Sequence, residues 1–217
     1  MKKNNLKKRI FTSLVLIFFI FLIFNSLYLM TSSLLILGIL SILEFFNLSK
    51  KIFNKKIYFF LSNLLFIIFI FIFSFFFFLL YNFQQSKFIL AVLLIGCVAS
   101  DIGGYMLGKI LKGPKLTKIS PNKTFSGAIG SFILSCTCFS SLIYYETKVF
   151  NFKIVIIGLM ISLFCQIGDL FFSYLKRKAD IKDTGNLLPG HGGLLDRLDG
   201  IFFGIPLGFV TLILLFL

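Results

Sequence analysis

Histidine, arginine and acidic side chains are scarce in this sequence. Its 217 residues include one histidine, three arginines and eight Asp or Glu, while hydrophobic residues make up 58% and the mean hydropathy is +1.00. An ordinary soluble domain is far less apolar and more charged. This composition indicates an integral membrane protein. Because each helical crossing takes roughly 20 apolar residues, we expect 217 residues to form six or seven crossings without room for a separate soluble domain.

Cysteine is also scarce, and its placement argues against a metal site. Cys97, Cys136, Cys138 and Cys165 all lie in apolar segments. A C-x-C pair on a helix points its two side chains in well-separated directions. We therefore expect the four cysteines to be small buried residues. The chain also shows no internal repeat and no low-complexity linker.

The net charge of +14 comes from short basic clusters between the apolar segments. Positive loops are retained on the cytoplasmic side of a membrane, so this pattern does not require nucleic acid as a partner. With a cytoplasmic N-terminus, 19 basic residues fall on the cytoplasmic side and three, Lys87, Lys148 and Lys153, fall outside. The asymmetry predicts that orientation.

The apolar runs predict an all-α polytopic membrane protein with about seven transmembrane helices. Residues 10–46 are too long for one crossing, so we expect two helices that meet near Asn25 and Ser26 or near Thr31 to Ser33, followed by a basic loop from Lys50 to Lys56. The further crossings are expected over residues 57–81, 88–110, 126–144, 153–173 and 200–217.

The amino-acid composition of the chain changes near residue 88. Sixteen of the 17 glycines lie at or after Gly96, and all six aspartates lie at or after Asp101. Glycine lets helix backbones approach closely within a membrane. We therefore predict an N-terminal transmembrane scaffold over residues 1–87 and a catalytic core over residues 88–217, with its active site at the cytoplasmic face.

The rare polar residues gather between Ser173 and Asp199. This stretch holds the single histidine, His191, two of the three arginines, Arg177 and Arg197, and four of the six aspartates. Packing alone gives no reason for such a concentration. The stretch is therefore predicted to form a functional site.

The aspartates suggest a metal centre. Asp101 and Asp169 lie within apolar segments, where a charge is costly unless it is paired, solvated or bound to a cation. Asp196 and Asp199 are three residues apart and share one face of a helix. With Asp169 they could supply three carboxylates to Mg²⁺. The alternatives are carboxylates paired with lysine and a solvated helix start that complements the helix dipole.

The basic residues suggest phosphate as a ligand. Arginine offers planar bidentate donation that lysine cannot supply, and glycines on both sides of His191 let the backbone approach a ligand. Contact with anionic lipid is the alternative for the basic cluster of Lys176, Arg177, Lys178 and Lys182. Acids, phosphate-binding cations and a membrane surface together favour phosphoryl or nucleotidyl transfer to a lipid headgroup.

Three motifs resemble those of the phosphatidate cytidylyltransferase (CDP-diacylglycerol synthase) family. The long one runs from SYLKR at Ser173, through Lys182-Asp183 and the PGHGG that contains His191, to DRLD at Asp196. Shorter ones are D-x-x-G-Y-x-x-G-K from Asp101 and S-P-N-K-T-F from Ser120. The resemblance covers about residues 88–204 and departs from the family pattern at Gly104, Asn122, Phe125 and Ser126.

The resemblance implies that CTP and phosphatidate give CDP-diacylglycerol and pyrophosphate, a step of phospholipid biosynthesis. It implies that the metal centre, of Mg²⁺ alone or with a second cation, is held by Asp169, Asp196 and Asp199. It places Asp101, Ser120, Lys123 and Thr124 on the substrates. The residues that complete the implied catalytic set are Lys176, Arg177, Lys182, Asp183, His191 and Arg197.

The resemblance implies a multi-pass protein of a bacterial-type inner membrane. Membrane lipid and a second copy of the chain, in a homodimer, are the expected neighbours. Another CTP- or metal-dependent lipid-phosphate transferase remains an alternative. A CDP-alcohol phosphotransferase would need acids after Asp199-Gly200, where the sequence is apolar. A cation-coupled transporter would explain Asp101 and Asp169 but not the basic stretch, and transporters often have repeated halves.

Overall fold

The computed structural model describes residues 22–117, 119–185 and 192–216. Within these residues six long helices form, and an isolated β-bridge pairs Lys115 with Thr124. The helices are α2 (Leu27–Ile52), α3 (Lys56–Asn82), α4 (Gln84–Leu111), α5 (Phe125–Thr147), α6 (Phe152–Lys178) and α7 (Leu195–Phe216). Each is long and apolar enough to cross a membrane. The expected all-α integral membrane architecture is confirmed.

The junction before α2 lies at the first of the two expected polar positions. Residues 22–25 are helical, and the chain breaks at Ser26, whose hydroxyl accepts a hydrogen bond from the Leu29 amide at 3.5 Å and caps α2. Most of the expected first crossing lies outside the described residues. The count of about seven crossings and the cytoplasmic N-terminus therefore stay predictions.

Two helices extend beyond the apolar runs that were used to predict their ends. Helix α6 continues past Ser173 to Lys178, and α7 begins at Leu195 instead of Gly200. Lys50 and Lys51 likewise belong to the last turn of α2, not to a loop. Basic residues near a helix C-terminus and an acid in a first turn both complement the helix dipole. Apolar length alone therefore missed the polar turns.

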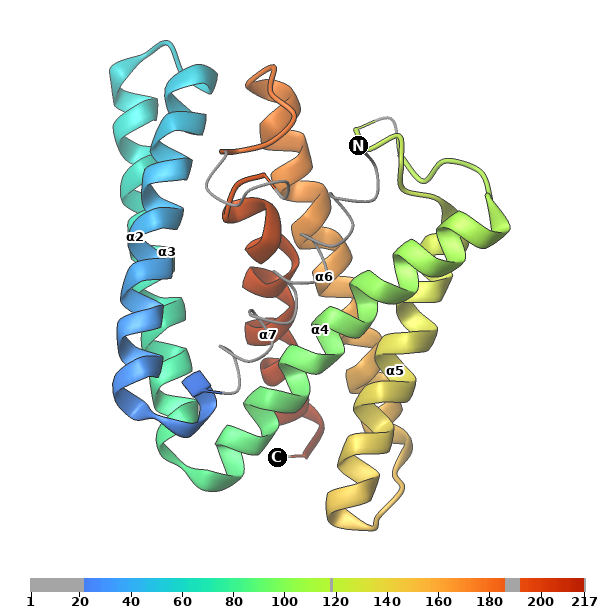
Figure 1. Ribbon diagram of the computed structural model, residues 1–217. Helices are drawn as coiled ribbons and strands as arrows, with labels where there is room; N and C mark the ends of the chain where they lie inside the picture. Colours follow the sequence, from blue (N-terminus) through green and yellow to red (C-terminus); the bar gives the residue numbers. More distant parts are fainter. Residues whose placement is uncertain (1–21, 118, 186–191, 217) are drawn as a thin grey trace, which may run out of the picture.

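The helices form two packed groups (Figure 1). Helices α2 and α3 run side by side, while α4 packs along α5 and α6 packs along α7. The Phe73 ring of α3 meets the Phe202 ring of α7 edge to face at a centroid distance of 5.0 Å. The phenylalanine-rich α3 thus joins the two groups through aromatic packing as well as facing lipid.

Small residues bring α4 and α5 into backbone contact. A Cβ atom added at Gly104 would lie 2.6 Å from the Ser131 hydroxyl, and one added at Gly127 would lie 2.8 Å from the Gly104 carbonyl oxygen. Gly103 and Gly130 face each other in the same way. No larger side chain fits at this contact, which agrees with the expected tightly packed second half.

Candidate active site

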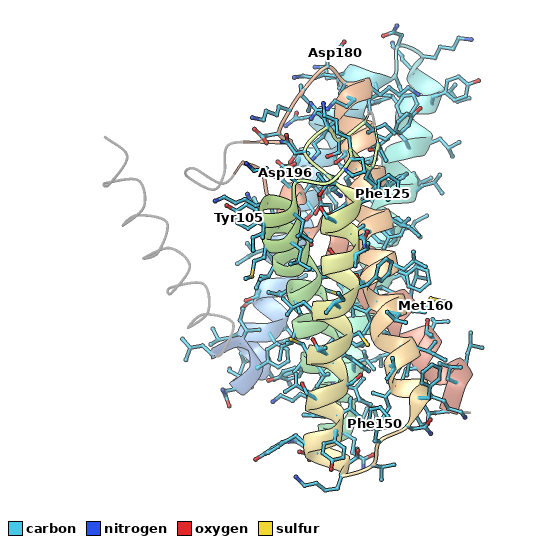
Figure 2. All side chains as sticks on the ribbon, turned by 90° about the vertical axis from the view of Figure 1, so that its right-hand side faces the viewer. Tyr105, Phe125, Phe150, Met160, Asp180 and Asp196 are labelled. Atoms are coloured by element: carbon cyan, nitrogen blue, oxygen red, sulfur yellow. The ribbon has the colours of Figure 1, made fainter. Side chains whose placement is uncertain are left out.

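A polar cavity of about 410 Å³ opens where α4, α5, α6 and α7 come together beside the segment 112–124. Its polar lining residues are Asp101, Tyr105, Ser120, Asn122, Lys123, Thr124, Ser131, Gln166, Asp169, Ser173, Asp196, Arg197 and Asp199. Figure 2 shows that Tyr105, Phe125 and Asp196 lie toward one end of the bundle, whereas Phe150 lies at the opposite end. Residues from three separate motifs therefore meet in one place.

One wall of the cavity is the start of α5. Thr124 is the N-cap of this helix, and its hydroxyl accepts a hydrogen bond from the Gly127 amide at 3.1 Å. The N-terminus of a helix carries partial positive charge and suits an anion. Lys123 lies next to it in the cavity wall. The expected phosphate contacts of Ser120, Lys123 and Thr124 are thus close to a helix end that favours them.

Three acids line the same cavity. Asp169 of α6 forms an ion pair with Lys123, with 2.8 Å between Nζ and Oδ2. Asp199 of α7 lies beside Asp169, and Asp101 of α4 lies in the field of Asp169, Lys123 and Arg197. Three carboxyl groups therefore share a cavity between membrane-capable helices with two basic side chains. A site with this balance favours an added cation.

The donor set fits a hard divalent cation that is shared with substrate. No group of three or more His, Cys, Asp or Glu among the described residues encloses a metal by itself. Mg²⁺ is commonly held by one or two carboxylates together with substrate phosphates and water. The adjacent Asp169 and Asp199 supply two carboxylates of this kind.

Asp196, the third expected metal ligand, is engaged elsewhere. Its Oδ1 accepts from Lys176 Nζ at 2.6 Å, while its Oδ2 accepts from the amides of Thr184 at 2.9 Å and Gly193 at 3.0 Å. Lys176 is itself buried. The Asp196 carboxylate in this structure ties α6 and the chain before α7 to the first turn of α7.

Glu44 of α2 was not among the residues predicted to form the site. It is only 4% exposed and accepts three hydrogen bonds, from the Thr184 hydroxyl at 2.7 Å and from the amides of Leu194 at 2.8 Å and Leu195 at 2.9 Å. The free amides at the start of a helix need acceptors. Glu44 therefore holds the start of α7, which carries three cavity residues, from within the expected scaffold.

Two glycines of the expected site are required by this arrangement. Gly192 has φ +84°, a left-handed conformation that favours glycine. A Cβ atom at Gly193 would lie 2.6 Å from Glu44 Oε2 and 2.7 Å from the Gly185 amide nitrogen. The glycines after His191 thus allow the backbone to approach Glu44.

Four other expected site residues, Lys176, Arg177, Lys182 and Asp183, do not line the cavity. Arg177 donates from Nε to the Ile119 carbonyl at 3.3 Å and from Nη1 to the Ile181 carbonyl at 3.2 Å. Lys182 and Asp183 are exposed in the segment that follows α6. His191 lies outside the described residues. The structure therefore brings together eight of the thirteen expected site residues, namely Asp101, Ser120, Lys123, Thr124, Asp169, Asp196, Arg197 and Asp199.

The two arginines are expected to differ when each is replaced by lysine. Arg197 lines the cavity, so Arg197→Lys should lower kcat/KM for the reaction proposed below by about 100-fold, as expected for losing a donor to developing charge. Arg177→Lys should cost less, because this guanidinium binds two backbone carbonyls. Initial rates on equal amounts of folded protein test the ranking, and an equal or reversed loss would contradict it.

The sequence of this chain matches a known protein family and several named proteins. The model of the cytidylyltransferase family matches residues 1–215. Proteins named phosphatidate cytidylyltransferase from Helicobacter pylori, Brucella melitensis and Staphylococcus aureus are 44%, 40% and 42% identical over 112, 122 and 116 residues. These matches cover 52%, 56% and 52% of this chain, and 42%, 44% and 45% of the relatives. The chain thus spans less than half the length of these relatives. On the match across nearly its whole length, the chain belongs to the cytidylyltransferase family.

Proposed function

We propose that this protein transfers the cytidylyl group of CTP to phosphatidate, forming CDP-diacylglycerol and pyrophosphate. The observation that carries the proposal is one membrane-level cavity in which a helix N-terminus, Lys123 and Arg197 face the carboxylates of Asp169 and Asp199. Both substrates are polyanions, so a site of this kind must neutralise phosphate and also accept a cation. Names of the relatives and membership of the family support the same reaction.

The reaction is an in-line displacement. A phosphate oxygen of phosphatidate attacks the α-phosphorus of CTP, the new P–O bond forms, and the bond from the α-phosphorus to the oxygen of the β-phosphate breaks. The electron pair leaves with pyrophosphate. Positioning and charge neutralisation supply most of the catalysis in phosphoryl transfer, so no covalent nucleophile is needed.

The side chains divide between the two ends of the displacement. Thr124 and the positive end of the α5 dipole would hold CTP phosphates at the helix N-terminus. Lys123 would exchange its partner Asp169 for a phosphate when substrate enters. Arg197 would neutralise the phosphate of phosphatidate or the departing pyrophosphate. The three positively charged groups, namely the N-terminus of α5, Lys123 and Arg197, would thus act within one cavity.

Asp169 and Asp199 would hold Mg²⁺, with Asp101 as a further acid of the same cavity. When bound, the cation neutralises phosphate charge that the two basic side chains leave uncompensated. Asp196 would act through Lys176 and the chain before α7, which it keeps in place. The proposal extends to a bacterial-type inner membrane, a cytoplasmic active site and a homodimer as the setting.

The direct test uses membranes that contain the full chain. Labelled CTP with phosphatidate and Mg²⁺ should give labelled CDP-diacylglycerol, and EDTA should abolish the product until excess Mg²⁺ restores it. Membranes with the Asp169→Asn variant serve as the matched control. Product formed at the same rate with EDTA would refute the metal assignment. Absence of product with phosphatidate, together with turnover of another lipid phosphate, would favour the wider class of lipid-phosphate transferases.

A further inference from the structure

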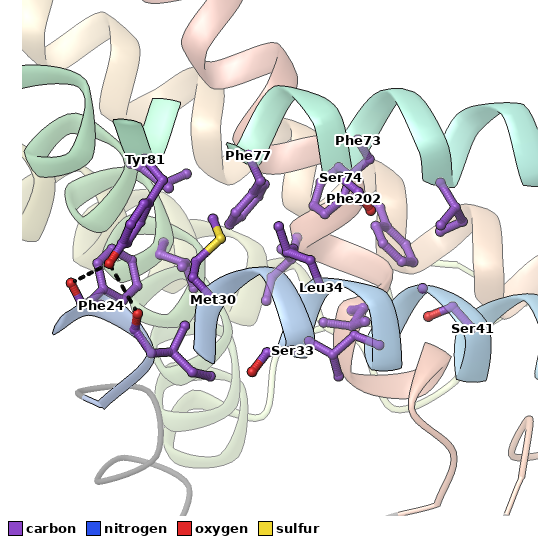
Figure 3. A pocket seen from close by; sticks show the side chains of 18 residues that line it. Phe24, Met30, Ser33, Leu34, Ser41, Phe73, Ser74, Phe77, Tyr81 and Phe202 are labelled. Carbon is purple, nitrogen blue, oxygen red and sulfur yellow. Dashed lines mark hydrogen bonds between the residues drawn. The ribbon is translucent and has the colours of Figure 1, made fainter. Parts of the chain in front are cut away.

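A second cavity, of about 200 Å³, lies among α2, α3, α4 and α7 and is apolar (Figure 3). Side chains such as Met30, Leu34, Phe73, Phe77 and Phe202 line it. All of these belong to helices that can span a membrane. An empty volume leaves its lining without dispersion contacts, and dry apolar cavities take up apolar ligands. The surroundings of this cavity suit a hydrocarbon chain.

One polar group at the pocket wall lacks a partner. Ser41 of α2 is fully buried, and its hydroxyl makes no hydrogen bond among the described residues. A buried donor without an acceptor costs about 1 to 3 kcal/mol. Ser41 lies one helical turn from Glu44, which holds the start of α7. The ester oxygen of a fatty acyl chain is an acceptor that could reach this level from the membrane.

The apolar pocket and the polar cavity are lined by different residues of the same two helices, α4 and α7. On α7, Arg197 and Asp199 line the polar cavity while Leu198 between them lines the apolar pocket. On α4, Asp101 and Leu94 are seven residues apart, so they share one face and lie about 10 Å apart along the axis. Val98 lies between them on that face and is 45% exposed. A chain leaving the polar cavity could therefore follow α4 into the pocket.

We propose that the apolar pocket holds one acyl chain of phosphatidate while its phosphate occupies the polar cavity. The inference rests on the proposed function and adds a place for the lipid tail. The headgroup lies beside Asp101, the upper part of the chain follows the exposed face of α4, and the end of the chain reaches Leu34 and Phe77. Because the surrounding bilayer is equally apolar, the pocket positions and selects the chain instead of drawing it in by the hydrophobic effect.

Photolabelling locates the chain without requiring turnover. The full chain in lipid nanodiscs is given phosphatidate with a diazirine near the end of one acyl chain, and the labelled peptides are mapped. Label should fall on the pocket side of α2 and α3, at Met30, Leu34, Phe73 or Phe77, and excess dioleoyl phosphatidate should compete for it. Label confined to the outward residues Phe71 and Phe75, or lost equally to phosphatidylcholine, would overturn the proposal.

Adjacent serines on α2 offer a matched pair for kinetics. Ser33 is buried in the pocket wall and Ser32 is exposed on the outside of α2. Ser33→Leu should lower kcat/KM for dioleoyl phosphatidate roughly tenfold, the lower range for one misplaced methylene in a fitted apolar pocket, and spare the short dioctanoyl substrate. Ser32→Leu should change neither. Equal losses on both substrates, or none, would contradict the assignment.

A second filling variant guards against a folding defect. Ser74→Leu fills the same pocket from α3, and it should show the same selectivity for chain length if Ser33→Leu does not accumulate. The two proposals fail in different ways. Turnover without label in the pocket would refute the acyl site alone, whereas label in the pocket without CDP-diacylglycerol would refute the cytidylyl reaction alone.

Discussion

Replacing Asp199 by asparagine should lower the rate of CDP-diacylglycerol formation by at least about 100-fold, the loss typical of removing one preorganised electrostatic group. Asparagine keeps the volume of the side chain and removes the charge that would hold a hard cation beside Asp169. The protein should still insert and fold, because neutralising an acid at membrane depth does not destabilise the fold. Rates of labelled product, per amount of folded protein, measure the effect.

Two further aspartates serve as comparisons. Asp180→Asn should keep the wild-type rate, since Asp180 is exposed and has φ 55°, a conformation that asparagine adopts readily. Asp196→Asn should lower thermal stability as well as rate, because it leaves the buried Lys176 with a weaker partner. A wild-type rate in Asp199→Asn would rule out Asp199 as a metal ligand.

Replacing Glu44 by alanine should destabilise the protein by about 3 kcal/mol and lower kcat in the fraction that remains folded. The change leaves two buried amides, of Leu194 and Leu195, without an acceptor, at about 1 to 3 kcal/mol for each unsatisfied group. Once the start of α7 is released, Arg197 and Asp199 lose their positions relative to Asp169. Thermal unfolding in detergent and kcat per folded protein should both fall.

The matched control uses the other glutamate of the chain. Glu146 is exposed near the end of α5, so Glu146→Ala should leave both unfolding and turnover unchanged. Glu44→Gln retains one acceptor oxygen and should fall between wild type and Glu44→Ala. If Glu44→Ala unfolded early but kept its full kcat per folded molecule, Glu44 would be a stabilising residue without influence on the site.

The helices could be predicted from the sequence because each crossing leaves a long apolar run, as residues 57–81 do for α3. The polar ends of the helices could not be predicted in this way. The turn from Leu195 to Asp199 has little apolar character of its own, and it is helical because Glu44 and Asp196 bind amides at its start. Contacts between residues about 150 positions apart leave no local signal.

The same reason limited the prediction of the site. The family resemblance brought Asp101, Lys123 and Asp169 into one hypothesis, and the cavity brings them together. Spacing could not distinguish Asp196 from Asp199, since both fit one helical face. The difference comes from Lys176, which lies 20 positions earlier and binds only Asp196 of the two.

The glycine contact between α4 and α5 also bears on how substrates enter. Two helices whose backbones touch at Gly104 and Gly127 have no compressible side chains between them, so they move as one rigid body. The distance between Asp101 on α4 and Thr124 at the start of α5 should therefore stay constant. Any opening and closing during turnover would have to come from motion of α6, α7 or residues 112–117 and 119–123 against this body, so those parts would govern release of product.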